Sequence, residues 1–170
     1  MNEAMLALSR AARSSMTIGE VSISRKALEI VQQLREENPA EEIQLEIAND
    51  PLLYADAELV RILLRNLLEN AVKFSRGRKP VRIEIGCEAR GDEVVCFVRD
   101  NGVGFDMEYA DRLFAPFQRL HSESEFPGTG IGLATAQRIV HRHGGSIWAE
   151  SAPEKGTTVY FTLPRVVSPI

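Results

Sequence analysis

The sequence has little cysteine, no long apolar run and no large excess of charge of one sign, and each absence excludes a class of protein. Two cysteines among 170 residues cannot form a disulfide framework. No apolar run reaches membrane-spanning length, and the N-terminus lacks the basic-then-apolar pattern of a signal peptide. We therefore expect a cytoplasmic chain without membrane contact of its own, which leaves open a membrane anchor elsewhere in a longer parent protein. The net charge of −4 argues against nonspecific binding to nucleic acid.

The rest of the composition is that of a folded domain. Hydrophobic residues make up 44% of the chain, which is enough for a sizeable core. We expect one main domain over residues 17–170, preceded by the end of a helix over residues 1–16. The two cysteines, Cys87 and Cys96, flank a Gly91-Asp92 hairpin loop. That loop would place them opposite each other on paired strands, as core thiols and not as a disulfide or metal site.

Hydrophobic periodicity predicts an α+β fold. One helix is expected to run from an N-cap at Ser24 to Glu37, and a long central helix from a cap at Asp56 to just before Gly77. Strands are expected at 43–47, 81–87, 94–98, 146–150 and 157–163, a short strand or linker at 17–24, and further helices at 107–113 and 132–141. This order favours a two-layer α/β sandwich, in which helices cover one face of a mixed, mostly antiparallel sheet.

The central helix carries a polar stripe. At about 100° per residue, Asn66, Asn70 and Lys73 fall within roughly a 60° arc, and Glu69 lies at its edge. An amide oxygen is a suitable ligand for Mg²⁺, and a lysine suits a phosphate group. The alternative is that these residues are only the polar edge of an amphipathic helix.

Two glycine-containing segments are further candidate sites. Asp100 ends a predicted strand and is followed by Gly102 and Gly104, so its carboxylate could accept a hydrogen bond from an amine such as that of adenine. A plain surface turn is the alternative. The G-T-G-I-G-L segment at 128–133 precedes a helix, where exposed backbone N–H groups favour anions. It is neither a Walker motif, since no Gly-Lys-Ser/Thr follows, nor a dinucleotide fingerprint, since no strand precedes it.

The order of these segments is more specific than any one of them. An N-x-x-x-N-A-x-K helix, a D-x-G-x-G turn, two phenylalanines within 113–117 and the G-T-G-I-G-L segment follow one another. Together they resemble the N, G1, F and G2 boxes in the catalytic, ATP-binding domain of bacterial sensor histidine kinases, of the GHKL superfamily. The resemblance covers roughly residues 17–165, including the closing G-T-T-V-Y-F-T-L-P at 156–164. The run at 116–133 is most similar to kinases attached to PAS or phytochrome-type sensors.

The resemblance implies ATP and Mg²⁺ as ligands. Asn70 would coordinate the metal, Asn66 would lie near the phosphates and Lys73 would neutralise their charge, which makes these three the expected catalytic residues. Asp100 would read the adenine amine, and Phe117 would help to anchor a lid. The full expected ATP site comprises Asn66, Glu69, Asn70, Lys73, Asp100, Gly102, Gly104, Phe117, Gly128, Thr129, Gly130, Ile131, Gly132, Leu133 and Thr158.

One position of the resemblance bears on the type of reaction. Hydrolases of the superfamily carry a water-activating glutamate four residues before the metal asparagine, where this chain has Asn66. Glu69 is three residues further along, about 300° around the helix, which is about 60° in the opposite sense, so it does not occupy that position. A histidine nucleophile needs no activated water. The substitution therefore favours phosphoryl transfer to histidine over hydrolysis of ATP.

The phosphoacceptor itself is expected outside this chain. In the family it lies on an earlier helical hairpin, and residues 1–16, which would be the tail of that hairpin, contain no histidine. We expect surface or capping roles for His121, His141 and His143. Expected partners are the phosphoacceptor helical domain and a response regulator receiver domain, and the fragment should be a monomer or a weak dimer through residues 1–16. A serine kinase of the anti-sigma type, a nucleotide-sensing module without transfer activity and a plain α+β domain remain as alternatives.

Overall fold

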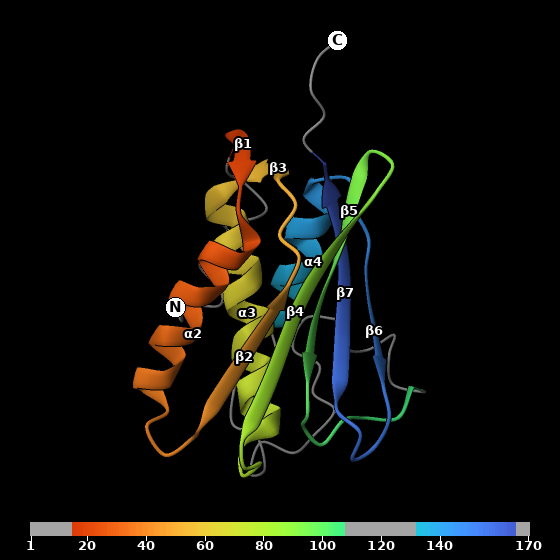
Figure 1. Cartoon of the computed structure of the whole chain (residues 1–170). Coiled ribbons are helices and arrows are strands. Elements are labelled where there is room, and N and C mark those ends of the chain that lie inside the picture. Colours follow the sequence, from red (N-terminus) through yellow and green to blue (C-terminus); the bar gives the residue numbers. More distant parts are fainter. Residues whose placement is uncertain (1–14, 108–131, 166–170) are drawn as a thin grey trace.

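The computed structural model describes residues 15–107 and 132–165, which form a layer of helices against a layer of strands (Figure 1). The elements in chain order are β1 (Ile18–Val21), α2 (Ile23–Glu37), β2 (Ile43–Ala48), β3 (Leu53–Asp56), α3 (Ala57–Ser75), β4 (Val81–Arg90), β5 (Glu93–Asp100), α4 (Gly132–Arg142), β6 (Ile147–Ser151) and β7 (Thr157–Pro164). The expected helix over 1–16, all but the first residue of the expected helix at 107–113 and the expected lid lie outside the described residues. Within the described part, no helix has the length and apolar character needed to cross a membrane.

The main sheet has five strands in the order β2-β4-β5-β7-β6. Only the β2–β4 pair is parallel, and the other three pairs are antiparallel. A second, two-stranded sheet pairs β1 with β3. The three described helices cover one face of the main sheet (Figure 1). The predicted α+β sandwich with a mixed, mostly antiparallel sheet is therefore confirmed.

Alternation along β4 and β5 builds the core under the helices. The inward side chains of β4 and β5 are buried, namely those of Val81, Ile83, Ile85, Cys87, Val94, Cys96 and Val98. Cys87 lies directly opposite Cys96, as predicted, and both are free thiols. A hydrogen bond with Cys87, together with burial, raises the pKa of the Cys96 thiol well above its usual range, so this thiol stays protonated and unreactive. On the outer side of the sheet, Arg99 Nη1 pairs with Glu84 Oε1 at 2.9 Å.

The N-caps of the helices show one confirmed and one wrong prediction. Asp56 caps α3 by accepting the backbone N–H of Leu59 at 2.9 Å, as predicted. The cap of α2, in contrast, is Ser22 and not Ser24, because the hydroxyl of Ser22 accepts the N–H of Arg25. Ser24 lies inside the first turn, where its N–H and its hydroxyl both donate to the carboxylate of Asp50.

A short strand between the two long helices is not evident from the sequence. No strand is predicted between residues 47 and 56, yet Leu53–Asp56 forms β3, which pairs antiparallel with β1. Leu53 and Ala55 are completely buried. The strand thus leads the chain from the sheet layer into α3 and places the capping carboxylate of Asp56 at the helix start.

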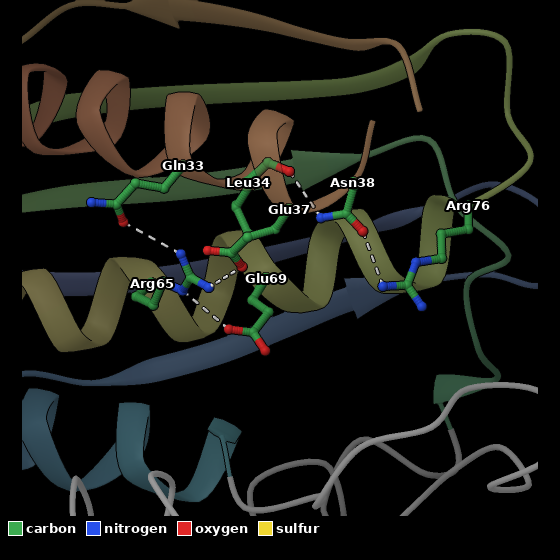
Figure 2. A network of polar contacts seen from close by, with 7 residues as sticks. All are labelled: Gln33, Leu34, Glu37, Asn38, Arg65, Glu69 and Arg76. Carbon is green, nitrogen blue, oxygen red and sulfur yellow. Dashed lines mark hydrogen bonds and ion pairs between the residues drawn. The ribbon is translucent and has the colours of Figure 1, made fainter. Parts of the chain in front are cut away.

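Helices α2 and α3 are joined by a polar network centred on Arg65 (Figure 2). The guanidinium of Arg65 binds Glu37 of α2 at 2.6 Å, Gln33 of α2 at 3.4 Å and Glu69 of α3 at 3.1 Å. At the end of α2, Asn38 donates to the carbonyl of Leu34 and accepts from Arg76, which continues the contact beyond the end of α3. These bonds fix the rotation of α3, and with it the direction of the polar stripe.

Candidate functional site

The polar stripe of α3 contains a buried donor that lacks a partner. Asn66, Asn70 and Lys73 are each partly buried, in a helix whose Leu67 and Leu68 are almost fully buried. Within the described part of the chain, the Nδ2 group of Asn66 is buried and has no hydrogen-bond partner. Leaving such a donor unsatisfied costs about 1–3 kcal/mol. A phosphate oxygen bound here would satisfy it, so this atom fits an anionic ligand.

Glu69 lies at the edge of the polar stripe of α3, about 60° around the helix from Asn66. Its carboxylate is held by Arg65, which also binds Glu37 of α2 (Figure 2). The side chain is exposed and occupied by this ion pair, so the structure gives Glu69 a role at the α2–α3 contact. It does not bring Glu69 together with the asparagine stripe.

Asp100 ends β5 with its carboxylate anchored by backbone donors. Oδ1 accepts the N–H of Gly102 at 2.9 Å and the N–H of Thr157 at 3.1 Å. Burial raises the pKa of Asp100 to about 6, although both hydrogen bonds oppose that rise. Both donors bind the same oxygen, so the second oxygen is the natural acceptor for a ligand amine.

The loop that follows Asp100 packs directly against the end of α3. The N–H of Val103 donates to the carbonyl oxygen of Phe74 at 3.1 Å. A Cβ at Gly102 would overlap the same oxygen, so only glycine permits this approach. The contact places Asp100 beside the C-terminal end of the helix that carries Lys73. The structure therefore brings together the N-x-x-x-N-A-x-K helix and the D-x-G-x-G turn, as the sequence predicted.

The β6–β7 turn supports the same loop from the other side. Gly104 has φ +66°, and a Cβ there would overlap the carbonyl oxygen of Ala152. The N–H of Glu154 donates to the carbonyl of Val103 at 2.6 Å. Gly156 has φ +80° and packs against the carbonyl of Asp100 in the same way. This turn therefore contacts the Asp100 loop through Gly104 and Gly156 and through hydrogen bonds from the N–H groups of Glu154 and Thr157.

The threonine beside Asp100 is Thr157, whereas the sequence motif pointed to its neighbour Thr158. The hydroxyl of Thr158 accepts from Arg99 Nε at 3.2 Å on the outer side of the sheet, away from the helices. Successive residues of a strand point to opposite faces of the sheet, so Thr157 and Thr158 lie on opposite faces.

Only the end of the G2 segment is described. Gly132 begins α4, and the side chain of Leu133 is buried. Phe117, Gly128, Thr129, Gly130 and Ile131 lie outside the described residues.

Comparison with known proteins identifies the family. Residues 55–167, more than half of the chain, match the model of the histidine kinase-, DNA gyrase B-, and HSP90-like ATPases. The chain belongs to this family. Cyanobacterial phytochrome A of Nostoc sp. is 45% identical over 69% of the chain, and the methanogenesis regulatory histidine kinase FilI of Methanothrix harundinacea is 38% identical over 94%. The match spans 16% and 18% of the length of these two relatives.

A solved structure agrees with this assignment. The catalytic domain of histidine kinase ThkA superposes with a TM-score of 0.72 and 26% identity, covering 88% of this chain and 97% of that one. Similarity to histidine kinases and to a phytochrome confirms the resemblance inferred from the sequence motifs. Two of these three proteins, FilI and ThkA, are histidine kinases by name.

The candidate metal ligand has few other potential protein ligands near it among the described residues. The described residues include no group of three or more His, Cys, Asp or Glu side chains that could hold a metal ion. A cation here would therefore take few protein ligands and complete its shell with water and substrate oxygens, which is the habit of Mg²⁺. The amide of Asn70 on the partly buried stripe fits that role.

The two described histidines have the surface and capping roles that were expected. His141 is exposed, as expected, and His121 lies outside the described residues. His143 is buried and is not a surface residue. Its Nδ1 bonds the carbonyl of Ile139 at 2.8 Å, which is a capping contact, and its Nε2 accepts the N–H of Asp56 at 3.0 Å. These two bonds require the neutral tautomer protonated at Nδ1 and leave no free nitrogen for phosphoryl transfer.

Proposed function

We propose that this chain is the catalytic part of a two-component sensor kinase, which binds ATP with Mg²⁺ and transfers the γ-phosphoryl group to a histidine on a separate helical domain. The single observation that carries the proposal is the contact of the Asp100 loop with the end of α3. Through the bond from Val103 to Phe74, the proposed acceptor for a purine amine lies next to the helix that carries the proposed phosphate-binding side chains.

Each residue of the cleft has a defined role in this proposal. Asp100 accepts the amine of adenine through the oxygen that Gly102 and Thr157 leave free. The unpartnered Nδ2 of Asn66 donates to a phosphate oxygen, and Lys73 adds positive charge. Asn70 offers its amide oxygen to Mg²⁺, which neutralises phosphate charge when bound.

The choice of acceptor follows from the side chains on the stripe. Asn66 cannot accept a proton from water because its amide is not basic, and the carboxylate of Glu69 is paired with Arg65. An imidazole nitrogen needs no such base. The bond between the γ-phosphorus and the bridging oxygen breaks, a P–N bond forms to the histidine and ADP leaves. In this proposal the chain positions the reactants and stabilises charge, and it does not activate water.

The remaining assignments are proposals of the same kind. Residues 1–16 form the end of the helical hairpin and its linker, and residues 17–170 form the catalytic domain. The hairpin domain supplies the histidine, and a response regulator receiver domain accepts the phosphoryl group from it. We place the chain in the cytoplasm, as a monomer or a weak dimer through residues 1–16.

A trans-phosphorylation assay tests the transfer step. The chain is incubated with Mg²⁺, γ-labelled ATP and a separately purified helical hairpin from a related sensor kinase. We expect label on the hairpin that is lost in acid and retained in base, as a phosphohistidine requires. Label that survives acid would show transfer to serine, and tight ATP binding without transfer to any hairpin would indicate a sensing module; either result contradicts the proposal.

A further inference from the structure

Ser151, the last residue of β6, connects three backbone segments through one hydroxyl group. Its Oγ accepts the N–H of Phe105 at 2.9 Å, donates to the carbonyl of Gly156 at 2.9 Å and lies 2.8 Å from the hydroxyl of Thr157. A serine hydroxyl has one donor and two acceptor positions. If Thr157 donates the third bond, all three positions are used.

Both segments that Ser151 holds also hold Asp100. Phe105 ends the loop that begins at Asp100, so its bond with Ser151 fixes the far end of that loop. Gly156 packs against the carbonyl of Asp100, and the N–H of Thr157 donates to its carboxylate at 3.1 Å. The hydroxyl of Ser151 is thus one bond away from Gly156 and Thr157, which both contact Asp100, whereas Gly102, the other backbone donor to the carboxylate, does not bond to Ser151.

A third tether fixes the middle of the loop without using Ser151. The N–H of Glu154 donates to the carbonyl of Val103, and Glu154 adopts φ 64°, which is uncommon for a residue other than glycine. Its carboxylate pairs with Arg78 near the end of α3 at 2.9 Å. This tether reaches Val103 and not the Asp100 carboxylate, so it keeps the loop in place when the Ser151 hydroxyl is removed. Loss of the Ser151 hydroxyl should therefore change the orientation of the Asp100 carboxylate more than the conformation of the loop.

We propose that Ser151 is a positioning residue for adenine recognition, and that its hydroxyl, acting through Thr157 and Gly156, orients the carboxylate of Asp100 toward the purine amine. The inference rests on the proposed function, which assigns adenine recognition to Asp100. It deepens that function by adding a specificity determinant that does not touch the nucleotide.

The test compares two ligands that differ only at the amine. Dissociation constants are measured by calorimetry for ATP and for purine riboside triphosphate, which lacks the 6-amino group, in the presence of Mg²⁺. Since one hydrogen bond to a charged acceptor is involved, the wild type should prefer ATP by roughly tenfold or more. Ser151→Ala should reduce that preference to about threefold or less while leaving the affinity for the analogue within about twofold. Ser151→Thr, which keeps the hydroxyl, should restore most of the preference.

The matched control is Ser22→Ala. Ser22 also uses its hydroxyl both as donor and as acceptor, but its partners are Asp50 and the N–H of Arg25 at the start of α2. This variant should lose stability and keep the preference for ATP. It thereby separates a general loss of stability from a loss of adenine recognition.

The outcomes distinguish the inference from the function on which it rests. An equal loss of affinity for both ligands in Ser151→Ala would show a merely structural role and overturn the inference, while the function stands. Equal affinity of the wild type for both ligands would instead overturn the role of Asp100. If Ser151→Ala does not fold, the nearly isosteric Thr157→Val removes one of the same contacts and must lower the preference; an unchanged preference there overturns the inference.

Discussion

The backbone N–H of Asp56 donates to Nε2 of His143 at 3.0 Å, across 87 positions of sequence. The same histidine bonds the carbonyl of Ile139 through Nδ1. One buried imidazole therefore joins the start of α3 to the end of α4. These helices carry the polar stripe and the end of the G2 segment, so this histidine helps to fix the positions of these two segments relative to each other.

Replacing that imidazole should destabilise the protein. In His143→Phe the ring volume is kept, but the buried N–H of Asp56 and the carbonyl of Ile139 lose their partner. We expect the free energy of unfolding to fall by about 1–3 kcal/mol in urea denaturation. His141→Phe, at an exposed position two residues earlier, should change it by less than about 0.5 kcal/mol. Equal effects of the two substitutions would show that the buried bonds contribute little.

Asp100 should make stability and binding respond to pH in opposite directions. Burial raises its pKa to about 6 from the ordinary 3.8, so the folded state binds the proton more tightly than the unfolded state. Its contribution to stability is then fully present below pH 3.8 and is lost as the pH rises through about 6. Asp100→Asn should therefore raise the free energy of unfolding at pH 7.5, by about 1 kcal/mol after allowance for partial exposure, and have little effect near pH 4.

The same titration should weaken adenine binding in acid. A protonated carboxyl is a poorer acceptor for the purine amine, so the preference of the wild type for ATP over purine riboside triphosphate should fall between pH 7.5 and pH 5. Asp100→Asn should show little preference at either pH. A preference that stays constant in the wild type over this range would contradict the role of the carboxylate.

Asn66 should show a trade-off between stability and binding. Asn66→Leu replaces a buried, unsatisfied donor with an apolar group of similar size, so the free protein should be at least as stable as the wild type, by up to about 1 kcal/mol. Affinity for ATP should fall at least about tenfold, because a charge-assisted bond to phosphate is lost. Thermal unfolding with and without ATP measures both effects. A destabilised free protein with unchanged ATP affinity would show that Asn66 is a structural residue.

Gly91 and Gly156 both adopt positive φ, but only Gly156 is closely packed. Substitutions at these two positions therefore distinguish the cost of backbone strain from the cost of lost packing. Gly91 has φ +63°, and a Cβ added there would meet nothing within 4 Å, whereas Gly156 has φ +80° and contacts the carbonyl of Asp100. Gly91→Ala should therefore cost about 1–2 kcal/mol from strain alone. Gly156→Ala should cost more and should also weaken ATP binding, because the Asp100 loop must move. Similar stability and similar ATP binding in the two variants would contradict the proposed packing of the turn.

Much of this fold could be predicted because every second residue is apolar and buried along most of the central hairpin, from Val81 to Cys87 and from Val94 to Val98. The pairing of Cys87 with Cys96 and of Glu84 with Arg99 follows from loop length and the two-residue period of a strand. The strand β3, in contrast, has only four residues, and its pairing with β1 is a tertiary contact that local pattern does not reveal. The predicted cap of α2 is wrong because Asp50, 26 residues away, takes up the hydroxyl and N–H of Ser24.

The candidate site was predictable where helical geometry or a glycine constrained it. The angular position of Asn66 and Asn70 on α3 and the need for glycine at Gly102 both follow from local geometry. The ion pair of Glu69 with Arg65 also involves Glu37 of another helix. The role of the β6–β7 turn depends on a contact between segments about 50 residues apart. Such long-range contacts are not encoded in spacing along the chain, so Ser151 carried no signal in the sequence.

The most direct test of the account is a calorimetric titration of ATP with and without Mg²⁺, in the wild type, Asn70→Ala and Asp100→Asn. We predict that the wild type binds ATP more tightly with Mg²⁺ and that Asn70→Ala loses most of this dependence on the metal. Asp100→Asn should keep the metal dependence and lose the preference for adenine over guanine nucleotides. Absence of ATP binding by the wild type, or unchanged metal and base dependence in both variants, would contradict the assignment of one nucleotide cleft to α3 and the Asp100 loop.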